Sequence, residues 1–329
     1  MFIPQSYGIA FLLMLLSMVC WGSWANTQKA TGTWRFELFY WDYIWGIVIC
    51  AVILGVTAGR TQTASPDSFF HNLSSASLHS IILAFAGGVI FNVANVLLVA
   101  AIAIAGMAVA FPIGIGLALV IGSVLNYVIS PKGNPLLLFG GVILVVVAII
   151  FDAMAYRRHS GGGRVTRIGI ALSLLCGVGM GLFYPFVAEA LTGERHLVPY
   201  TVAVVFALGA LASNFPLNYV FMRRPVAGAP LRAADYFAGS GRLHAWGVVG
   251  GLIWGVGTVS NFVASYAQMV GPATSYALGQ GATMISAIWG VFVWKEFRGA
   301  RRDVKTLLAM MFLFFILGLV GVALAPMIK

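Results

Sequence analysis

The sequence has few charged residues. Only 9% of its 329 residues are Asp, Glu, Lys or Arg, whereas 60% are hydrophobic. Soluble domains carry about 25% charged residues, so this composition excludes an ordinary soluble fold. A membrane-spanning helix needs about 20 mainly apolar residues. Suitable stretches cover residues 6–29, 37–58, 78–101, 107–129, 135–156, 167–190, 198–221, 243–268, 272–294 and 305–326. They are too long for a transmembrane barrel, which predicts an all-α integral membrane protein with ten transmembrane helices.

Cysteine is also scarce. Cys20, Cys50 and Cys176 each lie inside an apolar stretch, where a small hydrophobic side chain fills space in the core. This pattern excludes a disulfide framework and a cysteine metal site, and no metal or cofactor is expected. The N-terminus, MFIPQSYG, lacks the basic segment of a signal peptide. The first apolar stretch is therefore interpreted as a retained helix.

Titratable groups are nearly absent from the middle of the apolar stretches. The five histidines fall in loops or at helix ends, and Asp152 lies close to Arg157 and Arg158 at the end of the fifth stretch. There is no G-x-S-x-G elbow and no pair of acids in the membrane. An integral-membrane enzyme would need such a constellation, so the protein is not expected to be an enzyme.

Basic residues are distributed unevenly between the two sides. One side holds Lys29, Arg35, Arg157, Arg158, Arg164, Arg167, Arg223, Arg224, Arg232, Arg242, Lys295, Arg298, Arg301, Arg302 and Lys305. The other side holds Arg60, Lys132, Arg195 and Lys329. Basic loops stay in the cytoplasm. We therefore expect a plasma (bacterial inner) membrane protein with both termini outside, and the net charge of +10 indicates topology rather than nucleic-acid binding.

Two segments of the chain repeat each other. Residues 87–116 and 250–281 both begin with Gly-Gly, turn at Gly106 or Gly271, and reach a G-x-G step. The repeat unit is five helices, an odd number, so the second unit enters the membrane from the opposite side. This predicts two inverted five-helix repeats, 1–156 and 167–329, joined by a cytoplasmic linker, 157–166. Inverted repeats are typical of secondary transporters with a solute site between the halves, and the G-x-G steps are expected to weaken helices around that site.

Short motifs are spread over nearly the whole chain. They are Asp42-Tyr43, AGG (86–88) with Asn95, VIGSVLNY (120–127), GxxxGxFxP (177–185), RRP (223–225), YxxGxGRxHAWGxxGGxxxGxG (236–257) and W-x-x-x-x-x-K-E (289–296). Together they resemble the ureide permease family of the drug/metabolite transporter superfamily. That resemblance implies the superfamily's fold and proton-coupled uptake of allantoin, uracil and related oxo-derivatives of nitrogen heterocycles, a class that includes nucleobases.

Two features of the resemblance leave alternatives open. VWKEF (293–297) is also similar to the corresponding ending in bacterial rhamnose and glucose porters, so sugar uptake is a second reading and broad metabolite export a third. Plant members of the family carry a Walker A-like motif in a long central loop. The loop SGGGRVTR (160–167) lacks G-x-x-x-x-G-K-[ST], so nucleotide control is not expected.

Polar and aromatic side chains inside the apolar stretches are the candidate solute ligands. Such groups are costly in a membrane and often functional. The candidates are Trp21, Trp24, Asn92, Asn95, Tyr184, Asn214, Trp254, Asn261, Tyr276 and Gln280. Amides offer donors and acceptors that suit ureides, pyrimidine-diones and sugar hydroxyls alike. The alternative role is hydrogen bonding between helices. Asn92 and Asn95 share a helix face, so one of them is expected to face the cavity.

Acids near the helix ends are the candidates for proton coupling. These are Asp42, Glu37 and Glu189, and the family resemblance covers Asp42. The alternative for Asp42 is an ion-paired acid at a helix start, facing Lys29 and Arg35. Glu296 is expected to pair locally beside Lys295. Expected partners are a small solute, protons and membrane lipid, with no nucleic acid, and the oligomeric state is open.

Tryptophans crowd the first two apolar stretches. Trp34, Trp41 and Trp45 lie where an interfacial aromatic belt belongs. Trp21 and Trp24 lie deeper, across the Gly22-Ser23 step, where the helix is expected to be weakened. These two are predicted to form the cytoplasmic wall or gate of the solute pathway.

Overall fold

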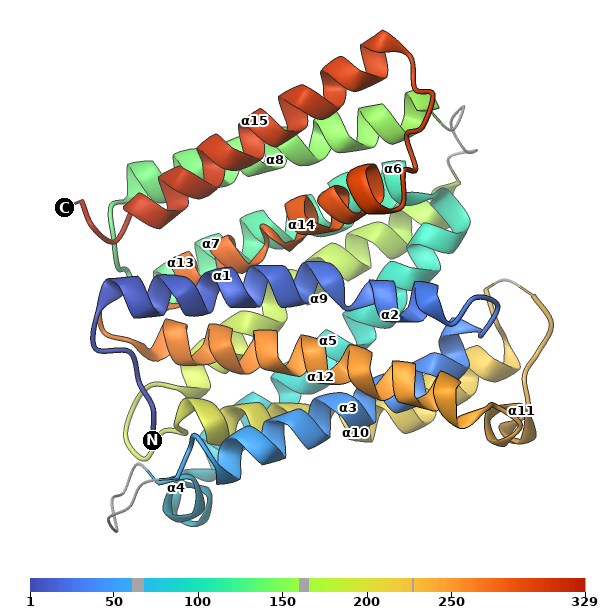
Figure 1. Cartoon of the computed structure of the whole chain (residues 1–329). Coiled ribbons are helices and arrows are strands. Elements are labelled where there is room, and N and C mark those ends of the chain that lie inside the picture. The colour runs from blue at the N-terminus through green and yellow to red at the C-terminus, as the bar shows by residue number, and fades with distance from the viewer. Residues whose placement is uncertain (61–67, 160–165, 227, 329) are drawn as a thin grey trace.

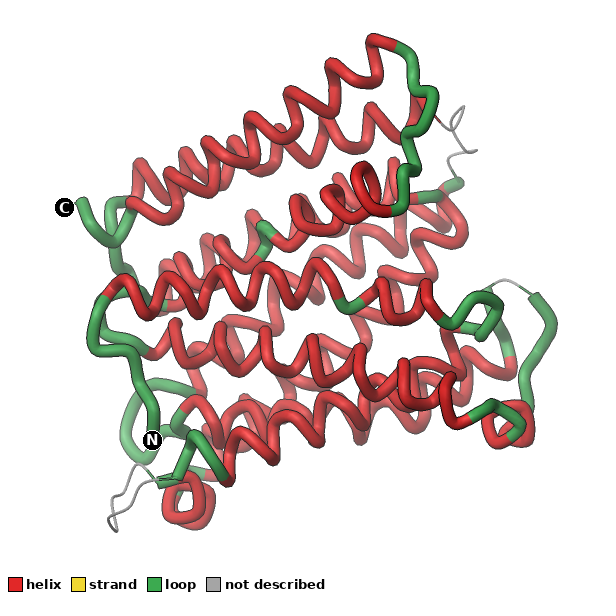
Figure 2. Tube along the Cα trace, viewed as in Figure 1, coloured by secondary structure: helices red, strands yellow, loops and turns green. Residues whose placement is uncertain are grey.

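The computed structural model describes residues 1–60, 68–159, 166–226 and 228–328, and within these every regular element is a helix. Ten segments are long and apolar enough to cross a membrane, and they lie side by side in one bundle (Figures 1 and 2). This confirms the all-α fold and the ten predicted spans. The spans are Tyr7–Ala30, Phe36–Val56, Leu78–Ala105, Phe111–Ile129, Pro135–His159, Arg167–Ala190, Pro199–Arg223, Gly241–Tyr266, Pro272–Val293 and Arg302–Leu324.

Several spans are single helices. They are α3 (Phe36–Val56), α5 (Leu78–Ala105), α8 (Pro135–His159), α9 (Arg167–Ala190), α10 (Pro199–Arg223), α12 (Gly241–Tyr266) and α15 (Arg302–Leu324). Two short helices, α4 (Phe69–Ser75) and α11 (Ala233–Phe237), lie in connections between spans. Both termini lie at one end of the bundle, called the terminal end, and α11 lies at the other, called the basic end (Figure 1). The remaining spans are interrupted.

The interruptions fall where glycine weakens the helix. The first span breaks at Trp24, between α1 (Tyr7–Ser23) and α2 (Ala25–Ala30). The fourth consists of a π-helical turn η1 (Phe111–Ile115) and α7 (Gly116–Ile129), and the short helix α6 (Met107–Ala110) precedes it. The ninth consists of α13 (Pro272–Gly279), α14 (Ala282–Ile288) and a π-helical turn η2 (Trp289–Val293). Local departures from α-geometry are frequent at functional sites.

The hairpin turns have the geometry that the glycines predict. Gly106 has φ 77° and Gly271 has φ 83°, a region that side-chain-bearing residues rarely adopt. Each turn therefore reverses the chain within a few residues. This places α6 directly after α5, and α13 shortly after α12.

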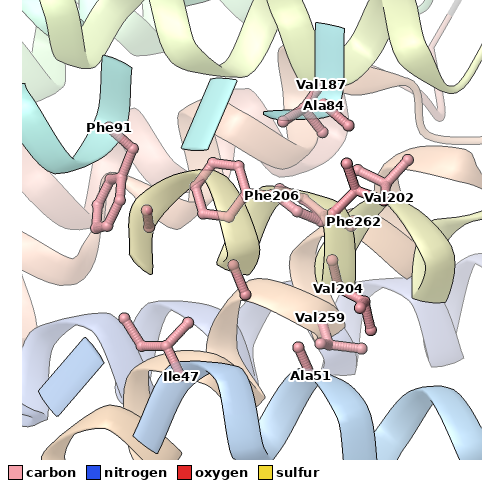
Figure 3. Close-up of a cluster of buried hydrophobic side chains, with 14 of the residues drawn as sticks. Ile47, Ala51, Ala84, Phe91, Val187, Val202, Val204, Phe206, Val259 and Phe262 are labelled. Atoms are coloured by element: carbon pink, nitrogen blue, oxygen red, sulfur yellow. The ribbon is translucent and has the colours of Figure 1, made fainter. Parts of the chain in front are cut away.

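The core lies where α3, α5, α9, α10 and α12 meet. Figure 3 shows Phe91, Phe206 and Phe262 in contact with smaller aliphatic side chains from the neighbouring helices. A second apolar cluster lies around α8 and α15. Glycine allows the closest crossings, because a Cβ on Gly88 would overlap the Phe206 carbonyl oxygen and one on Gly251 would overlap that of Tyr43. Small residues are what membrane helices use to approach this closely.

Equivalent helices of the two halves make equivalent packing contacts, each with helices of the other half. Helix α5 of the first half packs against α9 and α10 of the second half. Helix α12 of the second half packs against α1 and α3 of the first half. The Gly88 and Gly251 crossings are likewise the same contact made once by each half. These pairings support the proposal of two inverted repeats, 1–156 and 167–329. Residues 160–165, most of the predicted linker, and Lys329 lie outside the described residues.

Candidate solute site

A cavity of about 420 Å³ lies between the two halves. It extends from Phe91 and Trp254, near the middle of α5 and α12, to Gln28 of α2 and Ala103 near the end of α5. The deep part thus lies near the centre of the bundle, and the mouth lies toward the basic end. All three interrupted spans contribute lining residues, because broken helices expose side chains that a continuous helix would bury against its neighbours.

Stacked aromatic rings form the deep wall of the cavity. The Trp254 ring lies 4.3 Å from Phe91 and 6.0 Å from Trp21, nearly parallel to both. Trp24, at the break between α1 and α2, lines the cavity and packs 4.5 Å from the Tyr43 ring. Flat aromatic faces stack on planar solutes and also cover the apolar face of a sugar.

An amide network supports one polar edge. Asn95 lines the cavity, and its Nδ2 donates to the Tyr40 hydroxyl at 2.9 Å. Tyr40 donates to Asn92 Oδ1 at 2.9 Å, and Asn92 Nδ2 donates to Ser213 at 3.0 Å. Anchoring Nδ2 orients the Asn95 amide, so its Oδ1 is an available acceptor. Of the two asparagines on this face, Asn95 reaches the cavity and Asn92 lies buried behind it.

Further polar groups line the rest of the cavity. The amides of Gln28 and Gln280 and the hydroxyls of Thr283 and Ser286 all border the cavity. Thr283 donates its proton to the Gln280 carbonyl and Ser286 donates to the Gly22 carbonyl, which leaves both oxygens as acceptors. Trp21 donates to Thr258. Among the described residues that line the cavity, none is charged. The arrangement thus suits an uncharged solute with hydrogen-bonding edges.

Five predicted site residues lie outside the cavity, namely Asn92, Tyr184, Asn214, Asn261 and Tyr276. Asn261 binds Ser17 and Ser275 and accepts from Tyr184, while Tyr276 donates to the Ala118 and Met180 carbonyls. Asn261, Tyr184 and Tyr276 are fully buried in the half of the bundle toward the terminal end. Asn214 is also fully buried, and within the described residues its amide has no hydrogen-bond partner. The packing of Asn261, Tyr184 and Tyr276 closes the terminal end of the bundle, so these three side chains reach a solute only if that packing opens.

Comparison with known proteins identifies the family. The family model described as ureide permease matches residues 39–164 and 156–325. The chain belongs to the ureide permease family. Members of this family are transporters rather than enzymes, so this permease-family chain is an integral membrane transport protein.

The relatives cover nearly its full length. Ureide permease 1 and ureide permease 2 of Arabidopsis thaliana are 25% and 24% identical, each over 96% of both chains. The glucose uptake protein GlcU of Bacillus subtilis is 23% identical over 88% of this chain and 90% of its own. A solved crystal structure has a TM-score of 0.68 over 96% of this chain and 98% of the other. At 13% identity that likeness shows the fold alone.

The acids predicted to couple protons in this permease lie away from the cavity lining. Asp42 is buried and accepts from the Tyr236 hydroxyl at 2.7 Å and from His244 Nδ1 at 2.8 Å, rather than facing Lys29 or Arg35. Burial, and then the bond to Asp42, raise the pKa of Tyr236 well above its ordinary range, so Tyr236 remains a donor. Glu37 pairs with Arg35, and Glu189 is exposed at the end of α9.

Glu296 does not pair with its neighbour Lys295. It accepts instead from Lys29 Nζ and from the Tyr156 hydroxyl, each at 2.7 Å. Lys295 adopts φ 54°, so the chain turns sharply between η2 and Glu296. The expected local pair is therefore wrong, because only the tertiary structure brings α2 beside the end of the ninth span.

Sequence reasoning missed several residues of the site. Phe91 occupies the same place in the first repeat as Trp254 in the second, so aligning the repeats would have found it. Tyr40 lies in the aromatic run at the start of α3. The sequence pattern there does not distinguish it from residues that anchor a helix at the membrane interface. Gln28 lies beyond the helix break, where only the fold turns α2 toward the cavity.

Proposed function

We propose that this permease-family protein is a secondary transporter that takes up small, uncharged, planar solutes of the ureide and nucleobase class, such as allantoin and uracil. The observation that carries the proposal is the cavity lining of stacked aromatic rings and amide edges without a charged group. Such solutes alternate N–H and C=O groups around a flat ring, and buried amides discriminate strongly between polar solutes. The full-length ureide permease relatives support the same class.

Alternating access accounts for the asymmetry of the cavity. The mouth lies toward the basic end, which the predicted topology places in the cytoplasm, and the Asn261 and Tyr184 network closes the terminal end. The structure thus corresponds to an inward-facing state in this proposal. Asn92, Tyr184, Asn214, Asn261 and Tyr276 remain predicted ligands for states in which that packing rearranges.

Proton coupling is part of the proposal. Asp42, Glu37 and Glu189 remain predicted coupling residues, although none lines the cavity. Because no acid is among the described residues that line the cavity, a coupled proton does not act by direct contact with the solute. It acts instead on the positions of the helices around the cavity. The protonated group must therefore lie outside the solute site.

Sugar uptake is the second candidate. The GlcU relative favours it, and a tryptophan face also fits a pyranose ring. Broad export of lipophilic metabolites is less favoured, because the amide edges would lose their hydrogen bonds to water without replacement.

The test is a binding screen of the purified protein with uracil, allantoin, guanine, glucose and rhamnose. We expect stabilisation against thermal unfolding by uracil or allantoin and not by the sugars. The Asn95→Ala variant is expected to bind about 5- to 100-fold more weakly, since it removes a hydrogen-bond partner worth about 1–3 kcal/mol. Asn126→Ala is the matched control, because Asn126 is a buried amide outside the cavity that donates to the Gly122 carbonyl. Stabilisation by glucose or rhamnose alone would overturn the ureide assignment.

A further inference from the structure

Three acids of the described residues are buried within membrane spans, and they differ in their partners. Glu37 pairs with Arg35, and Asp42 accepts two hydrogen bonds. Asp152 of α8 is only 7% exposed, and its Oδ1 has no hydrogen-bond partner within the described residues. It makes no ion pair with the nearby Arg158, which binds Asp303 instead. A buried carboxyl with an unpartnered oxygen is costly in a membrane, which makes Asp152 a candidate for a functional role.

The surroundings of Asp152 contain a second acid. Tyr156 lies one turn further along α8, on the same face, and donates to Glu296 Oε2 at 2.7 Å. Glu296 also accepts from Lys29 Nζ at 2.7 Å. Although burial acts in the opposite direction, the hydrogen bonds from Lys29 and Tyr156 and the Lys29 charge keep the pKa of Glu296 below its ordinary value. Glu296 is thus an anion that pairs with Lys29 and accepts from the Tyr156 hydroxyl. Neither of these two groups donates to Asp152.

The other elements packed against α8 offer Asp152 no counter-ion. Residues 107–129, which form α6, η1 and α7, contain no Asp, Glu, His, Lys or Arg. In α15, Asp303 pairs with Arg158 and Arg301, and the two cations of this helix, Arg302 and Lys305, are exposed at the rim of the bundle. Asp152 is buried, whereas the Glu296 side chain is 33% exposed. A buried carboxyl group resists ionisation when a second negative carboxylate lies nearby. A proton on the uncompensated one relieves that repulsion.

The cluster is mechanically tied to the cavity mouth. Lys29 lies on α2, immediately after the cavity residue Gln28, and stacks 4.3 Å over the Trp294 ring. Trp294 donates to Asn26 at 2.6 Å, and Trp289 donates to Ser23 at 2.9 Å. The end of the ninth span and α2 are therefore joined by several bonds. A change in charge at Glu296 and Asp152 acts on the segment that carries Trp24.

We propose that Asp152 is a further proton-binding carboxyl of this transporter, and that Glu296, Tyr156 and Lys29 transmit its protonation to the α2 wall of the cavity. Asp152 takes up one proton from water on one side of the membrane, which converts its carboxylate to the acid. It releases that proton to water on the other side later in the transport cycle. The acid can donate a hydrogen bond and places no charge beside Glu296. This inference rests on the proposed transport function, and Asp152 is a positioning residue because it does not line the cavity.

The test uses the full-length protein in liposomes with a pH dye inside. Exchange of radiolabelled uracil, allantoin and glucose is measured without a gradient, and accumulation of each is measured with a pH gradient. In Asp152→Asn we expect exchange within about twofold of wild type, accumulation reduced at least about tenfold, and solute-driven proton movement reduced to background. Asp303→Asn is the matched control, an acid at the same end that is paired at the surface, and it is expected to accumulate solute like wild type.

Several results would overturn the assignment. Undiminished pH-driven accumulation in Asp152→Asn would do so, as would loss of exchange in a folded variant, because that would make the role structural. If the Asn variant does not fold, Asp152→Glu decides: we expect accumulation with a displaced pH profile, and an unchanged profile contradicts the proposal.

A separate readout needs no solute. Infrared difference spectra between acidic and basic buffer should show a protonated carboxyl band in wild type that is absent in Asp152→Asn. If the wild type exchanges none of the three solutes yet shows this band, the proposed function fails while Asp152 remains a proton site. An identical band in wild type and Asp152→Asn refutes the proton site.

Discussion

The five tryptophans of the first two spans have different surroundings. Trp21 and Trp24 line the cavity, whereas Trp45 is 44% exposed on the outside of the bundle. Trp34 packs edge-on against His244, and Trp41 donates to the Met222 sulfur. Interfacial anchoring therefore fits Trp45 best, while Trp34 and Trp41 also hold α3 to its neighbours. At the level of single residues, depth along the span separates solute contacts from anchors.

This difference makes a testable pair of substitutions. Trp24→Ala is expected to weaken binding of uracil or allantoin about tenfold or more, because stacking of a base on an aromatic ring contributes about 1–3 kcal/mol. Trp45→Ala, which removes a ring of the same size from the outer surface, should leave the dissociation constant unchanged. Isothermal titration of both purified variants measures the effect. Equal dissociation constants for the Trp24→Ala and Trp45→Ala variants would contradict solute contact by Trp24 and indicate a structural role.

Individual helices are shaped by glycine in two distinct ways. At Gly88 and Gly251 the missing side chain lets α5 and α12 cross a neighbouring backbone. At the G-x-G steps the chain departs from α-geometry, with Gly114 inside η1 and Gly279 and Gly281 flanking the break between α13 and α14. The first kind holds the bundle together, and the second opens the helices that border the cavity.

The crossing glycines predict a large loss of stability on substitution. Gly88→Ala places a methyl group against the Phe206 carbonyl, and backbone cannot move aside cheaply, so we expect destabilisation of about 1–3 kcal/mol. Gly140→Ala, on α8, meets no atom within 4 Å and should be neutral or stabilising by up to about 1 kcal/mol. Thermal unfolding in detergent compares the two, and similar melting temperatures would contradict the crossing argument.

The whole molecule is asymmetric although its halves repeat. The cavity lies toward the basic end, and the terminal end is sealed by buried hydrogen bonds. Charge is distributed along the same axis, with Arg157, Arg223 and Arg302 at the basic end. This asymmetry is what the proposed inverted repeat predicts for an inward-facing state, because in alternating access the two ends exchange their conformations.

Topology can be measured directly on this axis. In a variant without native cysteines, Ser240→Cys marks the basic end and Thr192→Cys marks the terminal end, both at exposed positions. We expect a membrane-impermeant maleimide to label the first only in inverted vesicles and the second only in right-side-out vesicles. The reverse pattern would place the basic loops outside and turn the proposed inward-facing state into an outward-facing one.

Span positions were predictable because each depends on local composition. The sixth span, Arg167–Ala190, was predicted to the residue, and Gly106 and Gly271 turn as expected. Asn95 lines the cavity, and its role as a solute ligand stays a prediction. Glu296 was assigned the wrong partner, because an ion pair between α2 and the ninth span depends on a separation of 267 residues.

The sequence by itself determined that the chain is a ten-span helical membrane protein and where its helices begin, turn and weaken, since hydropathy and glycine act over a few residues. It also determined the family. Only the tertiary structure decided which polar groups meet water and which meet one another. It placed Tyr184 and Asn261 in a closed network and Asn95 at the cavity, and it left Asp152 Oδ1 buried with no hydrogen-bond partner among the described residues. Those outcomes depend on contacts between distant helices, which no local pattern encodes.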